Sequence, residues 1–224
     1  MSSHHIYAIY GASGFGRETL PIARSMLAEA RRHGQECELV FVDDASAGSV
    51  VNDHRVLSYH EFCIAEALAK FVNVAIANST TRRALFERCA RDGIRPFQIH
   101  ASNVCTLDNI SIGPGSILAP FVTLTSNIRI GSAFHANIYS YVAHDCIIGD
   151  YVTFAPAVKC NGNVVIEDDA YLGTGCVLRQ GKPDEPLVIG RGAVVGMGAV
   201  VTKSVAPGTT VVGNPARPLE RRAG

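Results

Sequence analysis

The amino-acid sequence predicts a small α/β domain of Rossmann-like type, followed by a parallel β-helix. Two patterns predict this fold class. In the first half of the chain, short apolar runs alternate with helical segments, which is typical of a parallel sheet with helices packed on its faces. In the second half, apolar residues recur at every sixth position, a period that neither an α-helix nor an ordinary meander produces. Such a hexapeptide repeat indicates a β-helical solenoid.

The first domain is expected to span residues 1–100 and to contain three or four strands. The predicted elements are strands at 6–10, 39–42 and 72–77 and helices at 17–33 and 80–92. Gly11, Gly14 and Gly16 follow the first strand and open the first helix, a position where backbone N–H groups cradle phosphate. Their spacing, GxxGxG, differs from the dinucleotide pattern GxGxxG, so a nucleotide diphosphate is favoured over a nicotinamide cofactor.

Polar residues after the other strands are expected to complete this nucleotide site. Asp43 and Asp44 end the second strand, where they can accept hydrogen bonds from a ribose or a base. Asn78 and Arg82 follow the third strand. The predicted substrate-binding residues are therefore Gly11, Ser13, Gly14, Asp43, Asp44, Asn78 and Arg82.

The second domain, residues 101–224, carries the repeat. Its inward residues are expected to be Ile112, Leu118, Leu124, Ile130, Ala136, Val142, Ile148, Phe154, Cys160, Ile166, Leu172, Leu178, Ile189, Val195 and Val201. Three hexapeptides, or 18 residues, make one coil, so residues 18 apart stack on one another. The segment 181–187 interrupts the step, and loops extruded from a solenoid are often functional. The period does not determine the handedness of the coil.

The composition excludes several classes of protein. The chain has 224 residues, 47% of them hydrophobic, with 20 basic and 20 acidic side chains, so a folded core is expected and nucleic-acid binding is not. The seven cysteines include no CxxC pair, and neither a signal peptide nor a membrane-spanning apolar stretch is recognisable. We therefore expect a cytoplasmic protein with free thiols and no membrane insertion.

Several motifs resemble one known family. The array ends in VVGMGAVVTKSV, residues 194–205, and GNPAR, residues 213–217, an ending that resembles the hexapeptide acyltransferases. The resemblance narrows to one branch, the acetyltransferases of nucleotide-linked amino sugars with the sialic acid O-acetyltransferases. The features that carry it are the segments 11–18 and 143–149, Asp43 and Asp44, and Asn78 with Arg82 and Arg83. The resemblance implies a left-handed β-helix, acetyl-CoA as co-substrate and a homotrimer with active sites between subunits. The chain departs from the family at Phe15 and Thr153, where relatives carry histidine, so no acetyl-gripping histidine is carried over to position 153.

His144 is the predicted catalytic base. Acyl transfer needs a group that accepts a proton from the attacking atom, and imidazole does so near neutral pH. His144 lies two residues past an inward position, and Asp145 can hold its tautomer; the resemblance includes a pair of this kind. His100 and His135 are competing histidines, expected on the surface or at a trimer contact. The spacing of nine between His135 and His144 does not fit a zinc site, so no metal is expected.

The remaining predicted site residues concern the thioester. Gly162 lies 18 residues after His144, and its N–H is expected to donate to the carbonyl as it becomes an oxyanion. The resemblance places CoA in a groove between two solenoids, against Gly162, Thr174, Gly196 and Gly198. Lys203 and Arg217 are available for the phosphates of CoA. The 181–187 segment is expected to shape the CoA or sugar channel.

The sequence thus favours N-acetylation of a nucleotide-linked amino sugar by direct attack with a histidine general base. The alternatives are O-acetylation of a sugar such as sialic acid and a non-catalytic trimer that binds a nucleotide sugar. An intact pair of His144 and Asp145 argues against the non-catalytic alternative. The identity of the sugar and of its nucleotide stays open at this point.

Overall fold

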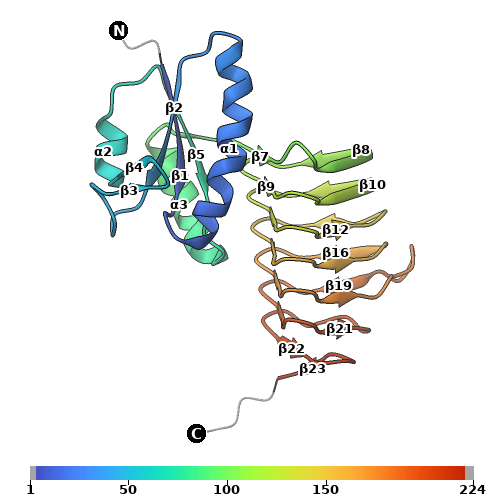
Figure 1. The fold of residues 1–224 in the computed structure, drawn as a ribbon. Helices are drawn as coiled ribbons and strands as arrows, with labels where there is room; N and C mark the ends of the chain where they lie inside the picture. Colours follow the sequence, from blue (N-terminus) through green and yellow to red (C-terminus); the bar gives the residue numbers. More distant parts are fainter. Residues whose placement is uncertain (1–3, 220–224) are drawn as a thin grey trace, which may run out of the picture. The chain divides into compact units, whose positions relative to one another are not determined.

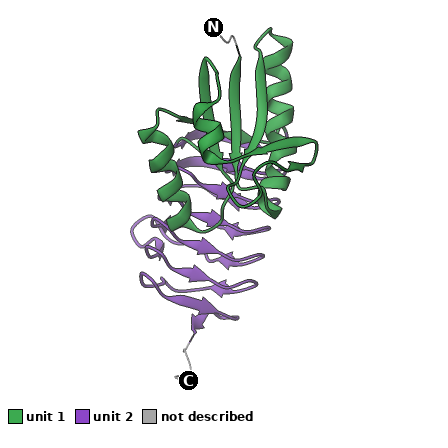
Figure 2. Ribbon diagram, turned by 90° about the vertical axis from the view of Figure 1, so that its left-hand side faces the viewer, with its two compact units in different colours: residues 1–102, 114–116 green, residues 103–113, 117–224 purple. Residues whose placement is uncertain are grey.

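A computed structural model of the chain describes residues 4–219, and Figure 1 shows the order of its elements. The chain divides into two compact units, coloured separately in Figure 2. The first comprises residues 1–102 and 114–116, and the second comprises residues 103–113 and 117–224.

The first unit is an α/β domain. Its elements are β1 (His5–Tyr10), α1 (Gly14–Arg32), β2 (Cys37–Val42), β3 (Val50–Val51), β4 (His54–Leu57), α2 (Tyr59–Ile64), β5 (Ala69–Val74), α3 (Ser79–Arg91), β6 (Arg95–Pro96) and β7 (Ile99–His100). Within the described residues, six of these strands form a sheet in the order β3-β4-β2-β1-β5-β6. The pairs are parallel except for the β3–β4 hairpin. The expectation of three or four strands was too low, because the extra strands β3, β4 and β6 have only two to four residues and no long apolar run.

The central strands are apolar because helices cover them. Val40 and Val42 of β2 and Val72 and Val74 of β5 are fully buried, as expected for a parallel sheet shielded on its faces. Because β1 lies between β2 and β5, the order in which strands are added to the sheet reverses at β1. Ligands of open α/β sheets bind outside the carboxyl ends of the strands at such a point.

The second unit is a solenoid with three flat sides, stacked coil upon coil as Figure 1 shows. The first side contains β9 (Ile117–Leu118), β11 (His135–Ala136), β14 (Thr153–Phe154), β17 (Tyr171–Leu172), β20 (Val194–Val195) and β22 (Thr210–Val212). The second and third sides contain β8 (Cys105–Ile112), β10 (Thr123–Ile130), β12 (Tyr141–Val142), β13 (Ile147–Ile148), β15 (Lys159–Cys160), β16 (Val164–Ile166), β18 (Val177–Leu178), β19 (Leu187–Ile189) and β21 (Val200–Val201). Neighbouring coils pair in parallel, for example Leu124 with Val142 and Val142 with Cys160.

This register confirms the predicted stacking of residues 18 apart. The inward series fills a continuous apolar core. After the insertion the step lengthens, so that Leu178 pairs with Val201. Both ends of the insertion are hydrogen-bonded to the preceding coil. The Gly181 N–H donates to the Gly162 carbonyl at 2.9 Å, and the Leu187 N–H donates to the Asn163 carbonyl at 3.1 Å.

Two corners of the solenoid matter for the site. The first corner joins the first side to the second and comprises residues 119–122, 137–140, 155–158, 173–176 and 196–199. The second corner joins the second side to the third and comprises residues 125–127, 143–146, 161–163, 179–186 and 202–204. The end of the solenoid is covered by the tail, because β23 (Arg217–Pro218) pairs antiparallel with β22.

Candidate active site

His144 and Asp145 form a hydrogen-bonded pair at the second corner. The His144 Nδ1 lies 2.7 Å from Asp145 Oδ2, and the two side chains are 46% and 47% exposed. Hydrogen bonds from His144 and then Asn127 lower the pKa of Asp145, which keeps it ionised at neutral pH. A carboxylate only accepts hydrogen bonds, so Nδ1 carries the proton and Nε2 is left as a proton acceptor.

Gly162 lies directly beside the imidazole of His144, one coil further along the second corner. A Cβ at Gly162 would lie 2.5 Å from His144 Nε2 and 2.5 Å from Cε1, closer than van der Waals contact allows. The absence of a side chain at position 162 therefore makes room for the ring. Among the described residues, the Gly162 N–H donates to no protein acceptor.

The insertion and Lys203 belong to the same corner as His144. Counting coils through the strand pairs, Lys203 lies three coils beyond His144, or about 14 Å at the usual strand spacing. The insertion leaves the solenoid between them, and its Lys182 Nζ pairs with Glu185 Oε2 at 3.1 Å. Lys203 is exposed.

The other predicted CoA residues lie elsewhere on the solenoid. Thr174, Gly196 and Gly198 are at the first corner, where the Gly198 N–H donates to the Thr174 carbonyl at 2.8 Å. Arg217 is in β23 and donates to the carbonyl of Ala216. Within one chain, the structure therefore brings His144, Gly162 and Lys203 to one corner and Thr174, Gly196 and Gly198 to another.

The two competing histidines were expected on the surface or at a trimer contact; the structure contradicts a surface position for His135, and it leaves His100 half-buried. His135 is 1% exposed and lies in β11, which pairs with β9 and β14. His100 is half-buried, with its Nε2 2.8 Å from Ser116 Oγ, and burial lowers its pKa. Of the three, His144 is the most exposed, with 46% of its side chain accessible to solvent.

In the first unit, the glycine loop is held by Asp43. The Ala12 N–H donates to Asp43 Oδ2 at 3.0 Å, and Gly11 has a left-handed φ of 104°. A Cβ at Gly16 would lie 1.8 Å from the Gly11 carbonyl oxygen, so the start of α1 packs directly against the loop. Gly14 and Ser13 are exposed at the N-terminus of α1, where helix N–H groups attract anions.

Asp44, Asn78 and Arg82 also make contacts within the domain. Asp44 Oδ1 accepts from the Tyr59 N–H at 2.7 Å, and Asn78 caps α3 by accepting from the Thr81 N–H at 2.8 Å. Arg82 is fully buried and donates through Nη1 to the carbonyls of Ile76 and Ala77. Arg82 thus stabilises the loop after β5, while Asp44 and Asn78 remain exposed at the sheet's carboxyl edge.

Known proteins resemble the chain over nearly its whole length. A model of the PglD N-terminal domain matches residues 7–89. The GDP-perosamine N-acetyltransferase of Escherichia coli is 54% identical over 217 residues, which cover 97% of this chain and 97% of that protein. The chain belongs to the hexapeptide-repeat sugar acetyltransferase family.

Solved structures confirm the predicted fold class of this acetyltransferase, an α/β domain followed by a left-handed β-helix. WeeI from Acinetobacter baumannii matches with a TM-score of 0.92 at 54% identity, over 96% of this chain and 100% of that chain. The acetyltransferase domain of PglB from Neisseria gonorrhoeae, in complex with acetyl coenzyme A, matches with a TM-score of 0.83 at 26% identity, over 96% of this chain and 100% of that chain.

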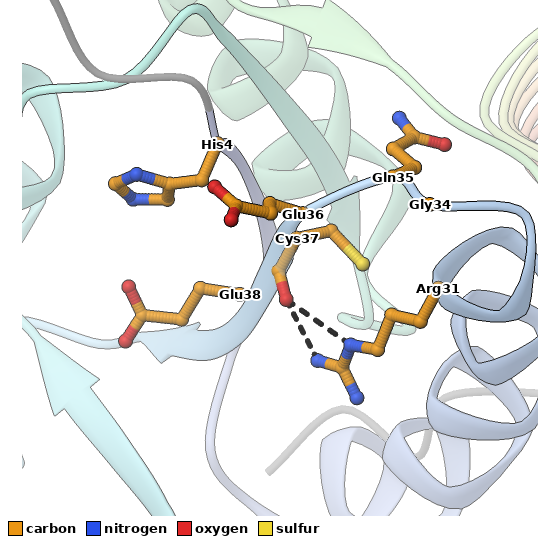
Figure 3. Close-up of a pocket in the computed structure, with 7 residues that line it drawn as sticks. All are labelled: His4, Arg31, Gly34, Gln35, Glu36, Cys37 and Glu38. Atoms are coloured by element: carbon orange, nitrogen blue, oxygen red, sulfur yellow. Dashed lines mark hydrogen bonds between the residues drawn. The ribbon is translucent and has the colours of Figure 1, made fainter.

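Two surface hollows differ in their relation to the site. One, of about 540 Å³, is drawn in Figure 3 and lies at the amino edge of the sheet, opposite the glycine loop; there Arg31 donates to the Cys37 carbonyl. The other, of about 440 Å³, lies on the acetyltransferase solenoid beside Asp145 and includes Asn127 and Arg129. The second hollow adjoins the pair of His144 and Asp145.

Three further observations bear on the sequence predictions. All seven cysteines of the acetyltransferase are free, as expected. Across residues 4–219, no group of acidic, cysteine and histidine side chains is arranged to hold a metal ion. No helix in that range has the length and apolarity needed to cross a membrane.

Proposed function

We propose that the protein transfers the acetyl group of acetyl-CoA to the amino group of a GDP-linked amino sugar, with GDP-perosamine as the first substrate to test. The observation that carries this proposal is the 54% identity to GDP-perosamine N-acetyltransferase over 97% of both chains. The acetyl coenzyme A complex of the PglB domain supports the choice of co-substrate. The free thiols support a cytoplasmic location, because disulfides are rare there.

In the proposed mechanism, His144 Nε2 accepts a proton from the sugar amine as its nitrogen attacks the thioester carbonyl. Asp145 holds the proton on Nδ1 and stabilises the imidazolium that forms. The Gly162 N–H donates to the carbonyl oxygen as negative charge develops. When the C–S bond breaks, His144 returns the proton to the departing sulfur of CoA, so the amide and the free thiol are the products.

Several exposed residues fit acetyl-CoA. A Cβ at Gly198 would meet no atom within 4 Å, which leaves open space for a pantetheine chain beside Thr174 and Gly196. Lys203 presents an exposed ammonium for phosphate, and Arg217 is a second exposed cation. The insertion at 181–187 leaves the second corner between His144 and Lys203, where it would border the same channel.

The experiment for this function is an acceptor panel. Purified protein is mixed with acetyl-CoA and with GDP-perosamine, UDP-linked amino sugars or free sialic acid, and thiol release is followed. We expect release with the GDP-linked amino sugar. Release with sialic acid alone would support the O-acetyltransferase alternative, and no release with any acceptor would support a non-catalytic nucleotide-sugar-binding protein.

We further propose a homotrimer. The base lies at the second corner and the proposed pantetheine residues lie at the first, so a second copy would bring the two corners together. Sedimentation at micromolar concentration should give three times the chain mass of 23.9 kDa. Mixing a His144→Ala chain with a Gly198→Tyr chain should restore part of the activity. A monomeric mass, or no restoration after verified subunit exchange, would contradict a shared site.

Asp44 is proposed to bind the nucleotide rather than to take part in chemistry. Asp44→Ala should raise the KM of the acceptor several-fold at nearly unchanged kcat, the pattern of lost uniform binding. Asp44→Asn is the matched control for structure, because its amide oxygen still accepts from the Tyr59 N–H. The KM of acetyl-CoA should not change in either variant. A large loss of kcat at saturating acceptor would show that Asp44 does more than bind the nucleotide of the acceptor, which contradicts the proposed position of the acceptor.

A further inference from the structure

A row of stacked amides runs along the second corner and ends on Asp145. Asn109 Nδ2 lies 2.8 Å from Asn127 Oδ1, and Asn127 Nδ2 lies 3.0 Å from Asp145 Oδ1. The three residues are each 18 apart, so they occupy the same position of successive coils. Donors and acceptors alternate along the row, and every bond in it points the same way, toward the carboxylate.

The backbone fixes this row in place. Asn109, Asn127 and Asp145 have φ values of 53°, 56° and 58°, a left-handed conformation that asparagine and aspartate adopt more readily than other side chains except glycine. The strands on either side of the corner pair β8 with β10. Each side chain therefore leaves the corner at the same angle as the one in the next coil, which brings the amides into hydrogen-bond distance.

The two oxygens of Asp145 are divided between two donors. Oδ1 accepts from Asn127 and Oδ2 accepts from His144. Because a free carboxylate at an exposed position rotates readily about its last bond, the bond from Asn127 restricts it to the orientation in which Oδ2 faces the imidazole. The pKa of Asp145 is lowered by both bonds, that of His144 contributing more.

We propose that Asn127, oriented by Asn109, is a positioning residue that holds the Asp145 carboxylate in line with His144 during acetyl transfer. This inference rests on the proposed function for its catalytic consequence, while the effect of Asn127 on the carboxylate does not depend on that function. Asn127 acts through Asp145 and does not touch the reacting atoms.

The test compares Asn127→Gly with Asn109→Gly. Glycine accepts the left-handed φ at both positions, so each variant removes one amide without backbone strain. The two differ in that only Asn127 contacts Asp145. Asn127→Asp is a second variant of the same shape, which cannot donate to Asp145 and adds a like charge beside it.

Two readouts are measured in each variant. In Asn127→Gly, kcat should fall roughly threefold to tenfold, about the loss of one oriented hydrogen bond, with both KM values unchanged; Asn109→Gly should lose about twofold or less. The pKa of the Asp145 carboxyl, followed by NMR of ¹³C-labelled aspartate, should rise in Asn127→Gly and rise further in Asn127→Asp. A merely structural role would leave this titration unchanged.

The outcomes separate the inference from the proposed function. An unchanged Asp145 titration in folded Asn127→Gly and Asn127→Asp would overturn the inference. Equal losses of kcat in Asn127→Gly and Asn109→Gly would overturn it as well. The loss would then come from changing any asparagine of this corner, and not from the lost hydrogen bond to the Asp145 carboxylate. If the wild-type chain transfers no acetyl group, the proposed function fails, and the titration still decides whether Asn127 holds Asp145.

Discussion

Replacing His144 with alanine is expected to lower kcat by a factor of about 10² to 10⁴, the usual contribution of a general base. Nε2 of this ring is the proton acceptor that its hydrogen bond to Asp145 leaves available. The fold should survive, because the His144 side chain is 46% exposed and lies outside the apolar core. Steady-state kinetics at saturating acetyl-CoA and acceptor provide the measurement, with the melting temperature as the check on folding.

The control for this prediction is Asp145→Asn, which should cost less, since Asp145 orients the ring and stabilises its charged form. If His144→Ala keeps more than about a tenth of the wild-type kcat, the loss of rate is smaller than the usual contribution of a general acid or base. His144 would then not be the base.

Gly162→Ala is expected to lower kcat by about tenfold to a hundredfold, the scale of loss when a reacting group is displaced by about 1 Å. The new methyl group would lie 2.5 Å from His144 Nε2, so the imidazole has to move. The Gly162 N–H is retained, so the loss reports on the position of the ring. The chain should still fold, because a solvent-facing side chain, and not backbone, gives way.

A double-mutant cycle tests this cause. If Gly162→Ala acts by moving the imidazole, then adding it to His144→Ala should change kcat little, because coupled residues are not additive. Full additivity of the two losses would mean that Gly162 acts independently of His144. A crystal structure of Gly162→Ala with an unmoved His144 ring would contradict the steric argument directly.

Much of the solenoid could be predicted from the sequence, because residues 18 apart in the chain occupy the same position of successive coils. The six-residue period gave the inward residues, and the 18-residue coil placed Gly162 beside His144. The same arithmetic connects Asn109, Asn127 and Asp145, yet these asparagines were not predicted to matter. Their significance depends on side-chain direction at a left-handed corner, which the period alone does not supply.

The α/β domain was less predictable at its edges and in its polar contacts. Strands β3 and β6 have two residues each, too few for an apolar pattern. Arg82 was expected to complete the nucleotide pocket because it follows the third strand, whereas it is buried and bonded to two carbonyls. Burial of such a residue depends on long-range packing, which composition and spacing do not encode.

The expected surface position of His135 was also wrong, since the residue is 1% exposed. The six-residue period identifies the inward positions, and it does not say which of the remaining positions are covered. His144, by contrast, lies two residues past the inward Val142, and its side chain is exposed as expected for such a position.

The most direct test of the account is the structure of the product formed from GDP-perosamine and acetyl-CoA. The isolated product should carry one acetyl group as an amide on the sugar nitrogen, formed in step with one equivalent of free CoA thiol, and His144→Ala should abolish its formation on the same time scale. An acetyl ester on a hydroxyl with the amine still free, or no acetylated product at all, would contradict N-acetylation of a GDP-linked amino sugar.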